Sequence, residues 1–430
     1  MCRKMSLYLV FLILIFTTYA FSQEFTDYQI WEEASSGNFF GLGARAMGMG
    51  GAQIATANDA LALVYNPACL AKIKRIEFSG GMTHQRLKNE TGLPGGARPA
   101  DLRSYFQNES IIQSNTRLSS ANIVLPVPTY RGSLVFALGV NRMKSFDRAF
   151  HAVLVDPSTG TTDLDASILE TGGINMWSLG GAMDLSPNIS VGGALNYWNG
   201  EDDILQEYYL PLTGKLGYEV WEQNHYLDSY SGWNGKLGFL IQPNRFLSLG
   251  GVIDFPTKFS IDQDYSFYYD SLHITEEGKI IEYTELGQYD LTHPYSFGAG
   301  TALTFKYVTL AGDIYYTDWA QMEGKGVDNK LIKENYQEVF RWHIGAEFVM
   351  PELSTKVRIG YYEDPIPFKS VYLKNDRRYF TLGAGFLIDQ VMTLDIAWNH
   401  GFHEFRDDWA QMIKESYTKD KIFVSLAYRL

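Results

Sequence analysis

Charged side chains recur at alternate positions along several apolar segments in the second half of the chain. A guanidinium held inside a protein can bind a substrate carboxylate through charge-assisted hydrogen bonds, and Arg341 and Arg358 are the candidates for that role. The same residues could instead form structural ion pairs with neighbouring acids. The full set is Asp313, Arg341, His343, Glu347, Lys356, Arg358 and Asp395.

Other groupings that could carry chemistry do not meet the requirements of a known site. Gly41–Ala46 has the letters of a dinucleotide-binding turn, but no strand precedes it. Gly43–Gly48 lacks the lysine of a phosphate-binding loop, and His400, His403 and Glu404 do not follow the order of a zinc-protease motif. The sequence therefore predicts no enzyme, no metal site and no cofactor.

The first residues have the pattern of a secretory signal peptide. Arg3 and Lys4 precede an apolar run over Leu7–Phe16, and residues 20–22 (A-F-S) form a cleavage signal. An uncleaved anchor helix is the alternative, but the apolar run is short for a membrane span. We expect residues 1–22 to be removed and the mature chain to leave the cytoplasm.

The charge and the cysteine content exclude two further classes. The formal net charge is −13, and removal of the signal peptide makes it more negative, which argues against nucleic-acid binding. Cys69 is the single cysteine after the signal peptide, so no disulfide can form within the mature chain.

From residue 75 to residue 430, apolar and polar residues alternate in segment after segment. Leu310 and Ile314 share one face of a predicted strand, for example, while Thr309 and Asp313 share the other. This period of two is the signal of β-strands with one apolar and one polar face. Residues 23–74 lack the alternation and are rich in glycine, alanine and methionine.

Short turns and long polar segments follow one another along the alternating region. The pattern is typical of an all-β transmembrane antiparallel barrel of about 14 strands in the bacterial outer membrane. Aromatic residues make up 15% of the chain, as expected for the two interfacial belts of such a barrel. The long segments cover roughly 85–116, 143–171, 201–228, 256–287, 320–337, 364–376 and 401–420.

Tryptophans gather where predicted strands meet long segments, which is where an outer aromatic belt should lie. A soluble exported β-sandwich or propeller is the alternative fold, but it does not account for an apolar outer face on nearly every strand. The six tryptophans are Trp177, Trp198, Trp233, Trp319, Trp342 and Trp398.

Several blocks of the sequence resemble the FadL/TodX family of outer-membrane transporters of hydrophobic compounds. The resemblance rests on Gly43–Ala52, Asn58–Ala60, the motif Asn66-Pro67-Ala68, Asp313–Trp319 and Arg358–Tyr362. It implies that residues 23–74 form a hatch that plugs a barrel made by residues 75–430. The chain departs from the family at its end, because Leu430 replaces the usual aromatic residue.

The resemblance also implies a route for the substrate. Long-chain fatty acids or hydrocarbons would be caught outside, pass the hatch and leave sideways into the membrane through a defect in the third strand. That strand is expected at about 131–143, and Gly132 and Gly139 are possible weak points because glycine in a strand often marks a bulge. The two glycines could equally serve only to relieve crowding.

Two long segments carry apolar clusters that could form the external capture surface. Exposed apolar groups usually mark a binding surface. The alternative is that these segments pack on each other or extend strands above the membrane. The candidates are Leu205, Tyr208, Tyr209 and Leu210 in the first segment and Phe267, Tyr268 and Tyr269 in the second.

A second function remains open from the sequence. The PorV branch of the same family consists of scaffolds or shuttles for secreted proteins, and such a barrel would bind secretion components. A transporter needs a continuous apolar path and a gap in the wall, whereas a scaffold needs neither. In either case the expected partners include outer-membrane lipid and the barrel-assembly machinery, and the transporter adds hydrophobic small molecules.

Overall fold

The computed structural model describes residues 41–92, 105–156, 160–211, 218–273, 278–367, 369, 377–406 and 414–430. All of them belong to one compact unit, Phe39–Leu430. The predicted signal peptide and the first part of the predicted hatch lie outside the described residues. Within the described part, no helix is both long and apolar enough to cross a membrane.

Fourteen antiparallel strands form a closed ring, as the sequence predicts, because β1 pairs with both β3 and β19. In order around the ring they are β1 (Glu77–Gly92), β3 (Glu109–Val127), β4 (Leu134–Ser145), β6 (Thr162–Ser186), β7 (Ile189–Leu210), β8 (Tyr218–Ile241), β9 (Leu247–Asp254), β12 (Ser296–Thr304), β13 (Val308–Asp318), β15 (Glu338–Met350), β16 (Thr355–Asp364), β17 (Arg377–Ile388), β18 (Met392–Arg406) and β19 (Lys414–Arg429).

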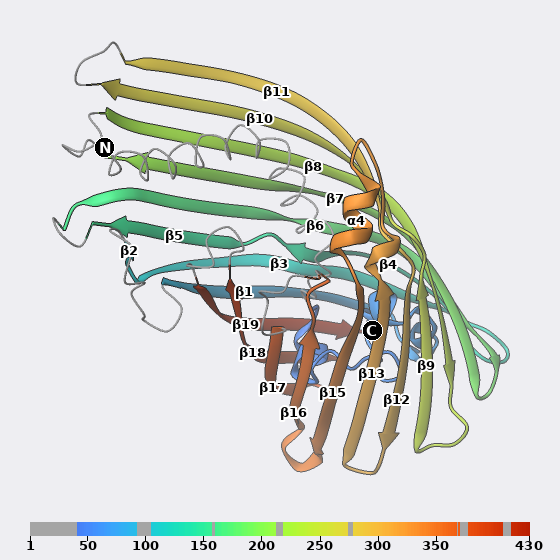
Figure 1. Ribbon diagram of the computed structural model, residues 1–430. Helices are drawn as coiled ribbons and strands as arrows, with labels where there is room; N and C mark the ends of the chain where they lie inside the picture. The colour runs from blue at the N-terminus through green and yellow to red at the C-terminus, as the bar shows by residue number, and fades with distance from the viewer. Residues whose placement is uncertain are drawn as a thin grey trace. The chain divides into compact units, whose positions relative to one another are not determined.

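Several strands continue far beyond the membrane at the end that carries the long connections. The strands β6, β7 and β8 contain 25, 22 and 24 residues, whereas a barrel strand needs about 9–11 to span the bilayer. They extend well past β12, β13 and β15 (Figure 1). Much of the predicted loop sequence is therefore strand. The added strands are β2 (Tyr105–Phe106), β5 (Arg148–Val155), β10 (Lys258–His273), β11 (Lys279–Thr292) and β14 (Glu323–Lys325).

The outer face of the ring is apolar, and part of the predicted tryptophan belt lies on it. Trp177, Trp233, Trp342 and Trp398 are between 42% and 57% exposed. The other two tryptophans of the predicted belt do not point outward. Trp198 occupies an inward position of β7 and packs on buried residues, and Trp319 is buried at the start of the short helix η3 (Trp319–Gln321).

Short helices before the first strand account for the lack of alternation there. They are α2 (Ala44–Gly48), α3 (Ala62–Tyr65) and η1 (Pro67–Lys72), and nearly all of their residues are buried. The remaining helices, α4 (Asn329–Asn335) and η4 (Pro351–Leu353), lie in connections between strands.

Candidate functional site: the hatch segment and the third strand

Residues 41–73, here called the hatch segment, contact inward-facing residues of strands all round the ring. The carboxylate of Asp313 accepts hydrogen bonds from the backbone N–H groups of Gln53 at 2.5 Å and Ile54 at 2.8 Å. The hydroxyl of Ser425 accepts from Ala44 N at 2.9 Å. Side chains of the wall thus satisfy backbone groups that burial would otherwise leave unpaired.

Asn66 of the predicted motif joins the hatch segment to the wall. Its Oδ1 accepts from Ala68 N at 3.1 Å and caps η1, with Pro67 at the first helical position. Its Nδ2 donates to Ile54 O at 2.7 Å within the hatch segment and to Phe239 O of β8 at 3.0 Å. The side-chain amide of Asn66 therefore forms hydrogen bonds through both its oxygen and its nitrogen, and the residue is 0% exposed.

Glycines on the inner wall allow the hatch backbone to approach the strands closely. A Cβ built on Gly192 of β7 would lie 2.5 Å from Pro67 C and 2.6 Å from Ala68 N, which is closer than real Cβ contacts. Glycines that face the hatch segment in the same way are Gly238, Gly250, Gly345, Gly360 and Gly383, on β8, β9, β15, β16 and β17.

A buried charge network lies where the hatch segment meets β15, β16 and β18. Arg358, 1% exposed, places Nε 2.7 Å from Glu347 and Nη1 2.6 Å from Asp395. Arg45 of the hatch segment lies 3.7 Å from the same Glu347. Burial acts to lower the pKa of Arg45, but the charges of Glu347, Asp59 and Asp395 together outweigh it, and the pKa lies above its ordinary value. The guanidinium of Arg358 is thus engaged in two ion pairs.

Arg341, the second predicted carboxylate ligand, is also ion-paired. Its Nε lies 3.0 Å from Asp364, whose other oxygen lies 3.3 Å from Nε of Arg377. On the long-connection side of the hatch segment, β19 adds two buried inward lysines, Lys419 and Lys421. Among the described residues, no group of three or more metal-ligating side chains could hold a metal ion.

The third strand of the ring is interrupted. The strand β4 ends at Ser145, β5 begins at Arg148, and the pairing of β3 with β4 stops at Ser120 and Asn141. Beyond that point β5 pairs with β6, and within the described residues no backbone ladder joins β5 to β3. The wall thus lacks continuous strand pairing between β3 and the third strand.

The two predicted weak points lie elsewhere. Gly132 has a φ of 73° in the turn between β3 and β4. Gly139 pairs in register with Asn122 of β3 and with Ser178 of β6, so the ladder is unbroken at that glycine.

Inward side chains of β1 and β3 bind the interrupted strand. Asp147, between β4 and β5, accepts hydrogen bonds from Asn115 at 2.8 Å and forms an ion pair with Arg117. Asn89 of β1 donates to Ala149 O at 3.0 Å, and Thr91 to His151 O at 2.5 Å. Side chains thus take the place of backbone partners at Ala149 and His151, whereas the outer end of β5 pairs with β2.

The glycines that lie opposite this interruption were not among the residues predicted from the sequence. Gly172 and Gly173 on β6 have φ values of 132° and 153°, a region that favours glycine, and they lie opposite the end of β4. A Gly-Gly pair inside an otherwise alternating segment was the available signal.

The predicted capture residues divide between the two faces of the extended sheet. Tyr208, Leu210 and Phe267 pack on one buried cluster that includes Phe150, Ile204, Tyr226 and Tyr265. Tyr269 shares that face by its position on β10. Leu205, Tyr209 and Tyr268 lie on the opposite face, where the rings of Tyr268 and Trp221 are 5.3 Å apart. Adjacent residues of one strand must point to opposite faces, so the two sets cannot form one surface.

A buried acid lies on the cluster side of β8. Asp228 accepts hydrogen bonds from Gln263 at 2.8 Å and Tyr289 at 3.3 Å. Burial raises its pKa to about 6, and these two hydrogen bonds oppose the shift. This residue lies beyond Trp233, in the part of β8 outside the membrane.

A closed fourteen-stranded barrel with apolar outer walls and a buried inner segment defines an integral β-barrel protein of the bacterial outer membrane. The sequence profile described as outer membrane protein transport protein (OMPP1/FadL/TodX) matches residues 28–408. The chain therefore belongs to this family, as the sequence resemblance implied.

Solved structures agree in fold. The Pseudomonas putida toluene transporter TodX is 16% identical with a TM-score of 0.65, and the match covers 91% of this chain and 99% of that one. A Pseudomonas aeruginosa FadL homologue is 12% identical with a TM-score of 0.61, over 90% and 98% of the two chains. The Ralstonia pickettii toluene transporter TbuX is 13% identical with a TM-score of 0.56, over 91% and 99%. No curated protein sequence matches the chain.

Proposed function

We propose that this barrel carries hydrophobic compounds, long-chain fatty acids or hydrocarbons, across the outer leaflet without an energy source. The substrate is captured at the apolar cluster of the extended strands, reaches the hatch segment inside the ring, and leaves sideways between β3 and the third strand. The interruption of the third strand at Phe146 and Asp147 is the observation that carries this proposal. A substrate that leaves into the membrane stays in apolar surroundings and needs no work for its release.

The apolar cluster supports the capture step. It combines aromatic and aliphatic side chains from five strands at the outer end of the barrel, and Tyr208, Leu210 and Phe267 remain partly accessible on it. Burial of apolar substrate surface contributes about 25 cal/mol per Å², which is enough to hold a long alkyl chain reversibly.

The inner wall favours a substrate with an acidic head. Arg377, Lys419 and Lys421 lie on the long-connection side of the hatch segment; Asp364 pairs with Arg377, and the acids that act on Lys421 are Asp364 and Asp147. A carboxylate gains charge-assisted hydrogen bonds there, whereas a neutral hydrocarbon gains none. Long-chain fatty acids therefore fit this wall better than hydrocarbons do.

A scaffold for secreted proteins accounts less well for the third strand. Such a barrel needs no gap in its wall, and an interrupted ladder has to be held by extra side chains such as Asn89 and Thr91. A channel that releases its substrate sideways requires such an interruption in the wall. A scaffold for secreted proteins does not require one.

Uptake by two matched variants tests the capture step. The substitutions L210D and F267D place charges on the buried cluster, whereas Y209D and Y268D place the same charges on the opposite face of the same strands. We expect L210D/F267D to slow uptake of a labelled long-chain fatty acid and Y209D/Y268D to leave it at the parent rate. Heat-modifiable migration on gels verifies that both variants fold. Equal uptake by folded L210D/F267D and the parent contradicts capture at this cluster.

The acidic-head preference has its own test. The substitution K419Q removes one inward charge and keeps the approximate length of the side chain. We expect slower uptake of the fatty acid and unchanged uptake of a neutral alkane. If neither substrate crosses in the parent protein, the transport proposal itself fails and the scaffold function takes its place.

A further inference from the structure

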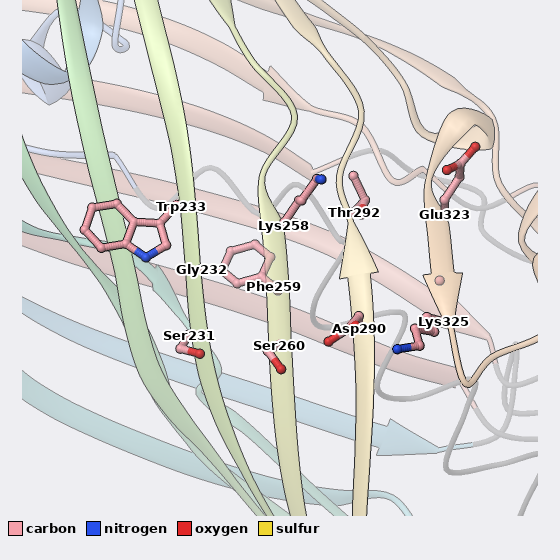
Figure 2. Close-up of a pocket in the computed structure, with 11 residues that line it drawn as sticks. Ser231, Gly232, Trp233, Lys258, Phe259, Ser260, Asp290, Thr292, Glu323 and Lys325 are labelled. Carbon is pink, nitrogen blue, oxygen red and sulfur yellow. The ribbon is translucent and has the colours of Figure 1, made fainter.

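Eight side chains on the outer surface form two rows across four adjacent strands, β8, β10, β11 and β14. The strand registers define both rows, and the residues are drawn in Figure 2. The row farther from the membrane is Ser231, Ser260, Asp290 and Lys325. The nearer row is Trp233, Lys258, Thr292 and Glu323. Together they line a cleft of about 450 Å³.

The cleft lies on the lipid-facing side of the barrel and at its upper boundary. Trp233 shares its face of β8 with Leu237 and Phe239, which are 51% and 46% exposed and belong to the apolar outer wall. Beyond Trp233 the next two residues on the same face are Ser231 and Ser229. Tryptophan marks the level where hydrocarbon gives way to headgroups, so the cleft lies at the height of the outer-leaflet headgroups.

Local structure explains why a recess forms at this height. Pro256 separates β9 from β10, and Pro294 separates β11 from β12, so two neighbouring strands are interrupted at one level. Proline cannot donate to a strand ladder. The short strand β14 pairs with the end of β11 and is the fourth strand that lines the cleft.

We propose that this cleft binds the phosphorylated sugar headgroup of an outer-leaflet glycolipid. Lys258 and Lys325 arise from strands two positions apart, about 10 Å, and from different rows, about 7 Å along the strands, so their backbone positions are roughly 12 Å apart. That separation suits a disaccharide with a phosphate at each end. Each lysine contributes a charge-assisted contact to one phosphate.

The other side chains suit the sugar and the acyl boundary. Ser231, Ser260 and Thr292 can donate to and accept from sugar hydroxyls, and the carboxylates of Asp290 and Glu323 accept from them. Trp233 is 57% exposed, with one edge toward the apolar wall and its ring available to the sugar. The site is independent of the transport route, because it lies on the outside of the wall.

Lipid binding to the purified full-length barrel in detergent tests the proposal. The probe is a glucosamine-disaccharide lipid with two phosphates, titrated and followed by native mass spectrometry. We expect one lipid per barrel, and we expect K258Q/K325Q to raise the Kd at least about tenfold. The same lipid without phosphates should bind the parent protein as weakly as the phosphorylated lipid binds the variant.

A matched variant controls for loss of positive charge. Lys279 lies on β11 at a position of opposite parity to Asp290, on the other face of the sheet, and Lys330 is 79% exposed on α4. K279Q/K330Q should bind the phosphorylated lipid like the parent. Equal loss in both double variants, or equal affinity for the two lipids, would overturn the site. Displacement of the lipid by millimolar inorganic phosphate would also overturn it, because the cleft would then bind a simple anion.

Discussion

Two adjacent glycines of β7 allow a matched test of the contact between hatch segment and wall. Gly192 faces the hatch segment, and its Cβ would lie 2.5 Å from Pro67 C. Gly193 faces outward, and its Cβ would lie 3.2 Å from the end of the Leu237 side chain, which can move. We predict that Gly192→Ala destabilises the barrel and that Gly193→Ala does not.

The magnitude follows from those distances. Ordinary Cβ contacts begin at 3.4 Å, so the backbone at Pro67 would have to retreat by roughly 0.9 Å. Overpacking of this kind costs about 1–3 kcal/mol, and a backbone neighbour places the cost at the upper end. Gly193→Ala should lie within about 0.5 kcal/mol of the parent, because a leucine tip yields cheaply.

Guanidinium unfolding of the two variants in detergent measures the difference, with heat-modifiable migration as a second readout. The variants share strand, residue type and substitution, so general effects of alanine cancel between them. Equal stability of the two would refute the reasoning, because it would mean that residues 66–68 do not lie against β7.

Three further outcomes are expected. Arg358→Met should lower the free energy of unfolding by about 3–5 kcal/mol, because Glu347 and Asp395 lose a buried partner; a loss below about 1 kcal/mol in guanidinium unfolding would contradict the network. Asn66→Asp keeps the cap but loses both donated bonds, and should cost at least about 1–3 kcal/mol in the same assay; parent-like stability would argue against the cross-link. Asp228, whose folded pKa of about 6 exceeds its unfolded value, should stabilise the extended strands less as pH rises from about 4 to about 6. Hydrogen exchange in β8 should therefore speed up over that range in the parent relative to Asp228→Asn, and identical pH profiles would exclude the effect.

The strand ladder could be predicted because each barrel strand separates lipid from lumen. Leu310 and Ile314 must face outward while Asp313 faces inward, so the sequence itself alternates. The count of fourteen follows from the same regularity. The motif at Asn66 predicted a turn in the hatch region, and the structure has Asn66 between α3 and η1.

The partners of the inward charges could not be predicted. Alternation indicates that Arg358 faces the lumen, but the acids and the hatch residue around it come from segments far apart in sequence. Charge alone therefore leaves substrate binding and structural pairing both open for Arg358.

The third strand and the external surface were harder for a different reason. Above the membrane both faces of a strand can be polar, so the alternation fades and strands resemble loops. Residues 143–171 therefore read as a loop, although they contain β5 and Asp147, and the Gly172-Gly173 pair follows directly after them. For the same reason the sequence predicts Tyr208 and Tyr209 on one capture surface, although consecutive residues of β7 point to opposite faces.

The inward glycines also constrain how the barrel is assembled. At Gly192 and Gly360 no side chain separates wall from hatch segment, so the hatch backbone is itself the inner layer of the wall. A ring closed without it would expose a belt of bare strand backbone to the lumen. We infer that the hatch segment is in place before β1 pairs with β19, and that docking and closure are one cooperative step. Deletion of residues 41–73 should then slow the appearance of the heat-modifiable form in pulse-labelled cells, and an unchanged rate would separate the two events.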